Sequence, residues 1–209
     1  MRDDEQYPLW LLLASTGMRR GEALGLPWRD LDLDAGRLAV RQSLLCIDGN
    51  PRIEEPKSRY SIRTIDLDRS TVAALQQRRA QQGHDRRPAG KYWTDNGLVF
   101  TRDDGVWLNP DWMSERFRLL SEDAGVPSIR MHDLRHTHAT LLLRQGINVK
   151  VVSERLGHHS VAFTLDTHAH VVPGMQREAA NAFGNLLPDL SQPDDDDDDD
   201  GTAGVTAMA

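Results

Sequence analysis

The chain has 209 residues, which is enough for one sizeable domain with a buried core. Seven of its 32 acidic residues form one aspartate run at 194–200, and the other 25 equal its 25 lysines and arginines, so the net charge of −7 neither supports nor excludes a nucleic-acid partner. The single cysteine, Cys46, excludes an intramolecular disulfide and fits a cytoplasmic protein, and the absence of a long apolar run argues against a membrane partner.

The first 30 residues predict two helices separated by a glycine turn. Apolar residues at helical spacing predict a buried helix over 4–16, which Gly17 ends. A shorter helix over 20–25 follows and ends at Gly25. Arg19 lies just after the turn, where an arginine either covers the surface or points into a cleft.

The next stretch changes from helical to strand periodicity. Runs at 37–45, 51–56 and 61–67 predict one small antiparallel sheet, with its first turn at Asp48–Gly49. Lys57 lies at the second turn of the sheet, where a lysine is usually just solvated.

Helices dominate the rest of the chain, apart from a predicted hairpin of 98–100 with 106–108. We expect a helix over 68–82, a loop over 83–97, and further helices over 109–124, 129–146, 149–157, 160–166 and 173–187. The polar, acidic segment 188–209 is expected to be a disordered tail. The pattern predicts a mainly α fold with a small antiparallel β-sheet (α+β), formed by one domain over 1–187.

Seven of the eight histidines fall between residues 132 and 170. On the helix expected here, His132, Arg135 and His136 share one face, so the first two can act on one ligand. His138 lies on the other face and is expected to fill a core position. Gly157 ends the next helix and places His158 at its C-terminal end. Such a concentration of imidazoles beside an arginine suggests a site for an anion or for a metal.

Five short motifs follow one another in an informative order. They are TGMR at 16–19, PKS at 56–58, HDLRH at 132–136, LGHHS at 156–160 and TLDTHAH at 164–170. Over nearly all of residues 5–187, this order resembles the tyrosine recombinase (phage integrase) family. The resemblance implies the catalytic-domain fold of that family and the cutting and rejoining of double-stranded DNA through a covalent phosphotyrosyl intermediate. It also implies no metal or nucleotide cofactor and a possible homo-oligomer, a tetramer on DNA.

The resemblance assigns a role to each matching residue. Arg19 and Arg135 match the two arginines that hold the scissile phosphate, and His158 matches a histidine that donates a hydrogen bond to it. Glu22 lies where the family keeps an acidic residue that supports the arginine. Guanidinium and imidazole donors in a dry cleft stabilise the charge that develops on phosphate oxygens.

Two further residues match the groups that move protons. Lys57 matches the lysine that protonates the leaving 5′ oxygen, a role that an ammonium group can fill. His132 matches the histidine that assists proton transfer and phosphate binding.

His168 departs from the family pattern. It stands where the family has its nucleophilic tyrosine, and no tyrosine follows Tyr92 in the sequence. An imidazole that attacks phosphorus gives a labile phosphoramidate rather than a phosphotyrosine. Three interpretations remain: a natural inactive relative, an engineered or sequencing variant, and a protein with a histidine nucleophile.

Other functions remain open on the sequence alone. His132 and His136 are four residues apart, a spacing at which histidines bind zinc on a helix, although Arg135 would lie beside the metal. A non-catalytic DNA-binding relative would differ from the enzyme only at His168, and a helical protein with histidines in its core is the plainest alternative. Most of the family carries a helical domain before the catalytic domain, whereas this chain is expected to start near the first helix of the catalytic domain. It is then a fragment, a truncated gene product or a relative without that domain, and each of these predicts weak DNA affinity.

Overall fold

The computed structural model describes residues 4–56, 61–127, 129–168 and 175–186. The chain forms two units, residues 1–170 and 171–209. In the second unit, α8 (Met175–Gly184) is the helix expected over 173–187, whereas the expected tail at 188–209 lies outside the described residues. Within the described ranges, no helix has the length and apolar character needed to cross a bilayer.

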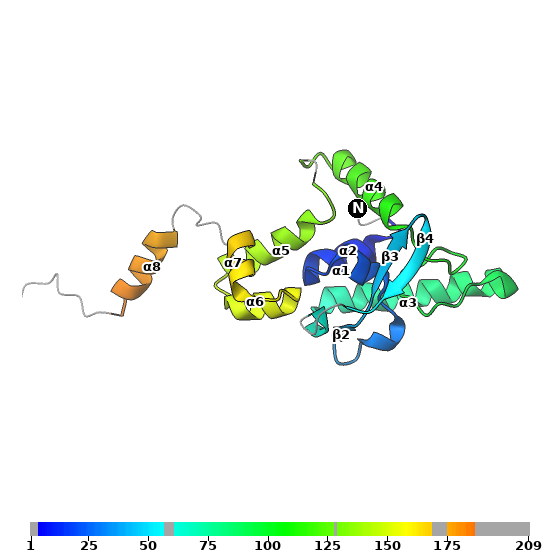
Figure 1. The fold of residues 1–209 in the computed structure, drawn as a ribbon, viewed down its shortest axis with the longest axis horizontal. Helices are drawn as coiled ribbons and strands as arrows, with labels where there is room; N and C mark the ends of the chain where they lie inside the picture. Colours follow the sequence, from blue (N-terminus) through cyan, green and yellow to red (C-terminus); the bar gives the residue numbers. More distant parts are fainter. Residues whose placement is uncertain (1–3, 57–60, 128, 169–174, 187–209) are drawn as a thin grey trace, which may run out of the picture. The chain divides into compact units, whose positions relative to one another are not determined.

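Most helices of the first unit begin and end where the sequence predicts (Figure 1). Gly17 ends the first helix in the left-handed conformation, with φ 66°. The side chains of Asp68, Asn109 and Asn148 accept backbone N–H groups at the first turns of α3, α4 and α6. The helices are α1 (Tyr7–Thr16), α2 (Arg20–Leu24), α3 (Arg69–Ala89), α4 (Pro110–Asp123), α5 (Asp133–Arg144), α6 (Val149–Leu156) and α7 (Val161–His168), with short 3₁₀ helices η1 (Trp28–Asp30) and η3 (Gly90–Tyr92).

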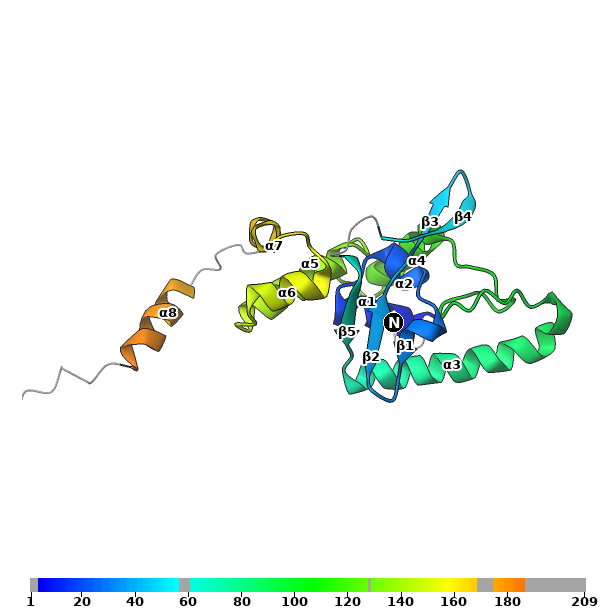
Figure 2. The same cartoon turned by 60° about the horizontal axis from the view of Figure 1, so that its bottom comes forward.

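The strands form two sheets, whereas the sequence analysis predicted one. One sheet is antiparallel in the order β1 (Leu31–Asp32), β2 (Arg37–Val40), β5 (Arg63–Asp66). The other is a hairpin of β3 (Ser43–Ile47) and β4 (Asn50–Glu54), which extends away from the first sheet in Figure 2. The predicted turn at Asp48–Gly49 is confirmed, and both of its residues have positive φ.

The second sheet separates because β3 packs on α2 instead of pairing with β2. A Cβ atom on Gly21 would lie 2.7 Å from the backbone oxygen of Leu44, and one on Gly25 would lie 2.6 Å from its nitrogen. These two glycines therefore let the backbone of β3 approach the helix closely. The predicted antiparallel pairing is correct, but the single sheet is wrong.

Two further predictions for the middle of the chain are corrected. The helix expected over 68–82 continues as α3 to Ala89, so the first part of the loop expected over 83–97 is helical. Its last turn contains Pro88, where the helix is about to end. The hairpin expected over 98–108 is reduced to isolated bridges, Thr101 with Trp107 and Pro27 with Leu98.

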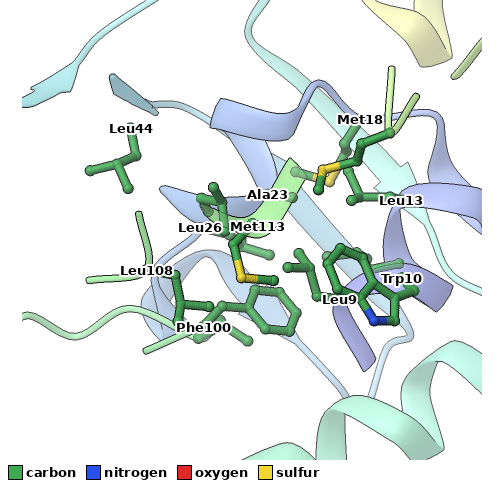
Figure 3. Packing of buried hydrophobic residues seen from close by; sticks show 14 of the residues in the cluster. Leu9, Trp10, Leu13, Met18, Ala23, Leu26, Leu44, Phe100, Leu108 and Met113 are labelled. Carbon is green, nitrogen blue, oxygen red and sulfur yellow. The ribbon is translucent and has the colours of Figure 1, made fainter. Parts of the chain in front are cut away.

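The main hydrophobic core lies where α1, α2 and α4 meet the three-stranded sheet and α3. Figure 3 shows Leu9 and Trp10 of α1 close to Phe100 and Met113, and the ring of Trp10 lies 5.5 Å from that of Phe117. A second, smaller core of Ala139, Val152 and Leu156 joins α5 to α6. The turn after α1 contacts this second core, because a Cβ atom on Gly17 would lie 2.6 Å from the Leu156 side chain.

Candidate functional site

The structure brings most of the expected site residues to one region of the first unit. Arg19 directly precedes α2, Arg135 lies on α5, and His158 follows α6. His168 is the last residue of α7, and His132 directly precedes α5. The remaining expected residue, Lys57, lies outside the described residues.

Arg135 is buried between the ends of two helices. Its guanidinium donates to the backbone oxygens of Gly17, after α1, and of Leu156, at the end of α6, both at 2.7 Å. C-terminal carbonyl groups of helices carry partial negative charge and often lack partners, so they suit a cation. Burial, and then the charge of Arg19, lower the pKa of Arg135 to about 9, so the group remains charged at neutral pH.

Glu22 connects two other arginines. Its carboxylate accepts Nη1 of Arg19 at 2.7 Å and the backbone N–H of the same residue at 2.8 Å. It also accepts both Nη atoms of Arg63, at 3.1 and 2.8 Å. Burial would raise the pKa of Glu22, but the hydrogen bonds and charge of Arg63, with the charge of Arg19, hold it below its ordinary value.

We call Arg19, Arg63 and Arg135 with Glu22 the arginine cluster. Three guanidinium groups and one carboxylate leave two positive charges in excess within the cluster. The side chains of Arg63 and Glu22 are both 6% exposed, whereas that of Arg19 is 42% exposed. The charge excess is therefore built into the protein interior and is presented to solvent mainly through Arg19, an arrangement that favours an anion.

Four imidazole rings lie next to one another beside the arginine cluster. The ring centroids are 5.0 Å apart for His132 and His136, 4.9 Å for His136 and His168, and 5.5 Å for His168 and His158. The last two rings are stacked, with their planes 3° apart. We call this set the histidine row. His158 and His168 are buried, whereas His132 is exposed.

The contacts within the histidine row restrict its protonation. The Nδ1 atoms of His136 and His168 are 3.3 Å apart, and such a hydrogen bond requires one of them to donate and the other to accept. The two rings are therefore not both cationic in this arrangement.

His158 is a neutral imidazole. Burial, and then the charges of Arg135, His168 and Arg19, lower its pKa to about 3. Its Nδ1 lies 2.9 Å from the hydroxyl oxygen of Thr164. The Thr164 hydroxyl can donate to this Nδ1 or to the more distant backbone oxygen of Ser160, at 3.4 Å. When it donates to Nδ1, the ring proton is on Nε2, and that atom is a hydrogen-bond donor for an anion.

His132 and Arg19 also line a common pocket. Its volume is about 430 Å³, and its other walls come from α2, β3 and the start of α4. Burial, the charge of His136 and the charge of Arg135 lower the pKa of His132. The pocket gives an anionic ligand access to Arg19 from solvent.

The predicted division of α5 into two faces is partly confirmed. Arg135 and Ala139 are buried on one side of the helix, as expected for a shared face. His138 lies between helices rather than in a core, since its Nδ1 is 3.0 Å from the backbone oxygen of Ala14 and its Nε2 accepts Arg155 at 3.1 Å. Burial and then Arg155 lower the pKa of His138 to about 4.

Arg63 is the residue of the arginine cluster that the sequence analysis missed. It was counted only as part of a strand, yet it lies two residues before Ile65, which is 1% exposed. Alternate residues of a strand point to the same face. This two-residue spacing is the signal that places an arginine on the buried face of β5.

The described histidines do not form a metal site. In the parts of the chain that the structure describes, no three His, Cys, Asp or Glu side chains converge closely enough to hold a metal ion. The contacts around Arg135 and Glu22 account for the charged groups without one.

Comparison with known proteins gives a consistent result. The model of the phage integrase family matches residues 4–174. The XerC-like tyrosine recombinase of Caldanaerobacter subterraneus subsp. tengcongensis is 34% identical over 191 residues, which are 86% of this chain and 49% of that protein. The ICEBs1 integrase of Bacillus subtilis is 31% identical over 172 residues, 82% of this chain and 46% of that protein. The chain thus spans about half the length of these relatives.

Solved structures share the fold. The Tn1549 transposon integrase in complex with transposon right-end DNA has a TM-score of 0.73 at 24% identity, over 89% of this chain and 61% of that chain. The XerA recombinase has a TM-score of 0.68 at 26% identity, over 87% of this chain and 59% of that chain. The mainly helical fold with its small antiparallel sheet is therefore that of tyrosine recombinase catalytic domains, and this chain belongs to the phage integrase family of tyrosine recombinases.

Proposed function

We propose that this chain is the catalytic domain of a site-specific DNA recombinase that holds one backbone phosphate of double-stranded DNA at the arginine cluster. We further propose that the chain as written does not form the phosphotyrosyl intermediate, because His168 stands in the place of the nucleophile. The observation that carries the proposal is the excess of two positive charges around Glu22, with Arg19 exposed to a ligand.

The roles follow from the geometry of the cluster. Arg19 and Arg135 would stabilise the charge on the non-bridging oxygens of the phosphate, and Nε2 of neutral His158 would donate a further hydrogen bond. The role of Lys57, which lies outside the described residues, comes from the family resemblance alone: it would give a proton to the leaving 5′ oxygen. His168 stacks on His158, so a side chain at this position lies beside a group that would contact the phosphate.

A tyrosine at position 168 would complete the reaction. Its phenol oxygen would form a bond to phosphorus while the bond from phosphorus to the 5′ oxygen breaks, and the 5′ oxygen would take a proton. Histidine in the same place offers only a ring nitrogen, whose product with phosphorus hydrolyses readily. We therefore expect DNA binding without a stable covalent product.

The test compares the chain with His168→Tyr and His168→Phe, using supercoiled plasmid DNA and detection of covalent protein–DNA adducts after denaturation. We expect an adduct from the Tyr variant alone, because Phe supplies the ring without the hydroxyl. Adding Arg135→Met to the Tyr variant should abolish it. Band-shift measurements at low salt confirm that each protein binds DNA.

Two results would contradict the proposal. An acid-labile, alkali-stable adduct from the unchanged chain would identify histidine as a working nucleophile. If none of the folded proteins binds DNA, the proposed DNA-binding function is refuted. The same band shifts test whether several copies act together on one DNA, as the resemblance implies, since successive complexes of higher mass would then appear.

A further inference from the structure

Arg63 contacts three separate parts of the chain from its place at the start of β5. Its Nε donates to the backbone oxygen of Arg155 on α6 at 2.7 Å, and its Nη1 donates to that of Ser61 at 3.1 Å. Its two Nη atoms reach Glu22 of α2. Because the side chain is buried and its donors are occupied by fixed acceptors, Arg63 is held in one orientation and is not exposed to a ligand.

These contacts limit the hydrogen bonds that Glu22 can accept from Arg19. The Oε1 atom of Glu22 is shared by Nη1 of Arg19 and Nη1 of Arg63, and its Oε2 atom by the backbone N–H of Arg19 and Nη2 of Arg63. Four donors surround one carboxylate. Arg19 therefore has one Nη atom on Glu22, while among the described residues its Nη2 has only a long contact of 3.5 Å, to the backbone oxygen of Gly157.

Loss of the Arg63 side chain would change this arrangement in a definite way. Glu22 would keep a buried negative charge with Arg19 as the remaining arginine beside it. A carboxylate and a guanidinium then favour two parallel hydrogen bonds. Arg19 would turn further onto Glu22, and its second Nη would no longer be available to an anion.

The surrounding backbone leaves space for Arg63. A Cβ atom on Gly157 would lie 2.9 Å from Nη1 of Arg63 and 3.1 Å from its Cδ, so any side chain at this position would displace the guanidinium. Gly157, which directly precedes His158, thus leaves room for the Arg63 side chain rather than for a ligand.

We propose that Arg63 is a positioning residue, which occupies Glu22 so that Arg19 stays available to the DNA phosphate. This inference rests on the proposed function, because it assumes that Arg19 holds a phosphate. It assigns Arg63 no contact with DNA.

The test is a double-mutant cycle in the full chain. The affinity for a fluorescent mixed-sequence duplex is measured over a range of low salt concentrations for Arg63→Met, Arg19→Met and the double variant. Each single variant should weaken binding by about tenfold and lower the salt slope by about 0.9, the value for one lost phosphate contact. The double variant should bind no more weakly than Arg19→Met alone, since the effect of Arg63 passes through Arg19.

Arg78→Met is the matched control. Arg78 is also a buried arginine with backbone partners, as its side chain donates to the oxygens of Val99 and Thr101. Its replacement should lower the melting temperature without changing the salt slope. If Arg63→Met does not fold, Arg63→Lys replaces it: a lysine keeps the charge but not the paired hydrogen bonds, so binding should weaken less than with Arg19→Met.

The outcomes separate the two proposals. If Arg19→Met leaves DNA affinity unchanged, the proposed function fails, and the inference fails with it. If Arg19→Met weakens binding but a folded Arg63 variant does not, or if the two losses add in the double variant, only the role of Arg63 is refuted.

Discussion

The arginine cluster and the histidine row lie beside each other, but they are held in different ways. Arg135 is fixed by two helix-end carbonyl groups, and Arg63 by backbone oxygens and a buried carboxylate. His136, His158 and His168 contact one another mainly ring to ring. Backbone acceptors do not change when a side chain is replaced, so the backbone contacts that hold Arg135 and Arg63 do not depend on the residue at position 168. We therefore expect that the residue at position 168 can be replaced while the arginine cluster keeps its arrangement.

The largest effect is expected from removing the negative charge of Glu22 from the arginine cluster. Glu22→Gln keeps the shape of the side chain but leaves two buried or half-buried arginines without their carboxylate. We expect a loss of about 3–5 kcal/mol in the free energy of unfolding, measured by urea denaturation. Glu115→Gln, on the exposed surface of α4, is the control and should have little effect. A small loss in Glu22→Gln would mean that the cluster is not tightly coupled.

A smaller loss of stability is expected when a glycine is replaced in the backbone that joins the arginine cluster to the histidine row. Gly157 has φ 69°, and an added Cβ atom would also meet Arg63, whereas Gly146 has φ 73° with open space around its Cβ position. Gly146→Ala should lose about 1–2 kcal/mol from backbone strain alone. Gly157→Ala should lose more and should also weaken DNA binding, since it displaces Arg63. Equal losses in thermal unfolding would show that the contact with Arg63 is unimportant.

The smallest effect concerns the histidines. His158 and His138 have pKa values of about 3 and 4 in the folded protein, below the ordinary value of 6.5. Between pH 6.5 and about 4, the unfolded chain binds protons that the folded chain does not, so stability falls as the pH falls. From pH 7 to 5 we expect Tm to decrease by on the order of a few degrees. The double variant His138→Gln/His158→Gln should show a shallower decrease, and an unchanged slope would contradict this assignment.

Local sequence signals predicted much of the fold, because they depend on neighbouring residues. Gly17 and Gly157 mark helix ends by their own chemistry, and the structure has helix ends there. The separation of the second sheet could not be predicted in this way. It depends on Gly21 of α2 and on Gly25 directly after that helix, which let the backbone of β3 approach closely once the chain has folded.

In the candidate site, too, residues in local motifs were predicted and a residue that depends on distant contacts was not. The order of the motifs pointed to Arg19, Arg135 and His158, which the structure brings into one region, although their roles stay predictions. Arg63 has no motif of its own, and its pairing with Glu22 joins residues 41 positions apart. Only the two-residue spacing from Ile65 indicated that it faces inward.

The long sequence distances within the site bear on how the protein is made. Arg135 binds an oxygen 118 residues earlier in the chain, and Arg19 reaches one 138 residues later. During synthesis, the first part of the chain emerges and folds before its later partners exist. A nascent chain that ends before residue 156 has the Gly17 oxygen but lacks the Leu156 oxygen, which also holds Arg135, and the Gly157 oxygen, which contacts Arg19. The arginine cluster therefore reaches its final arrangement only after α6 has been made, when nearly the whole first unit is present.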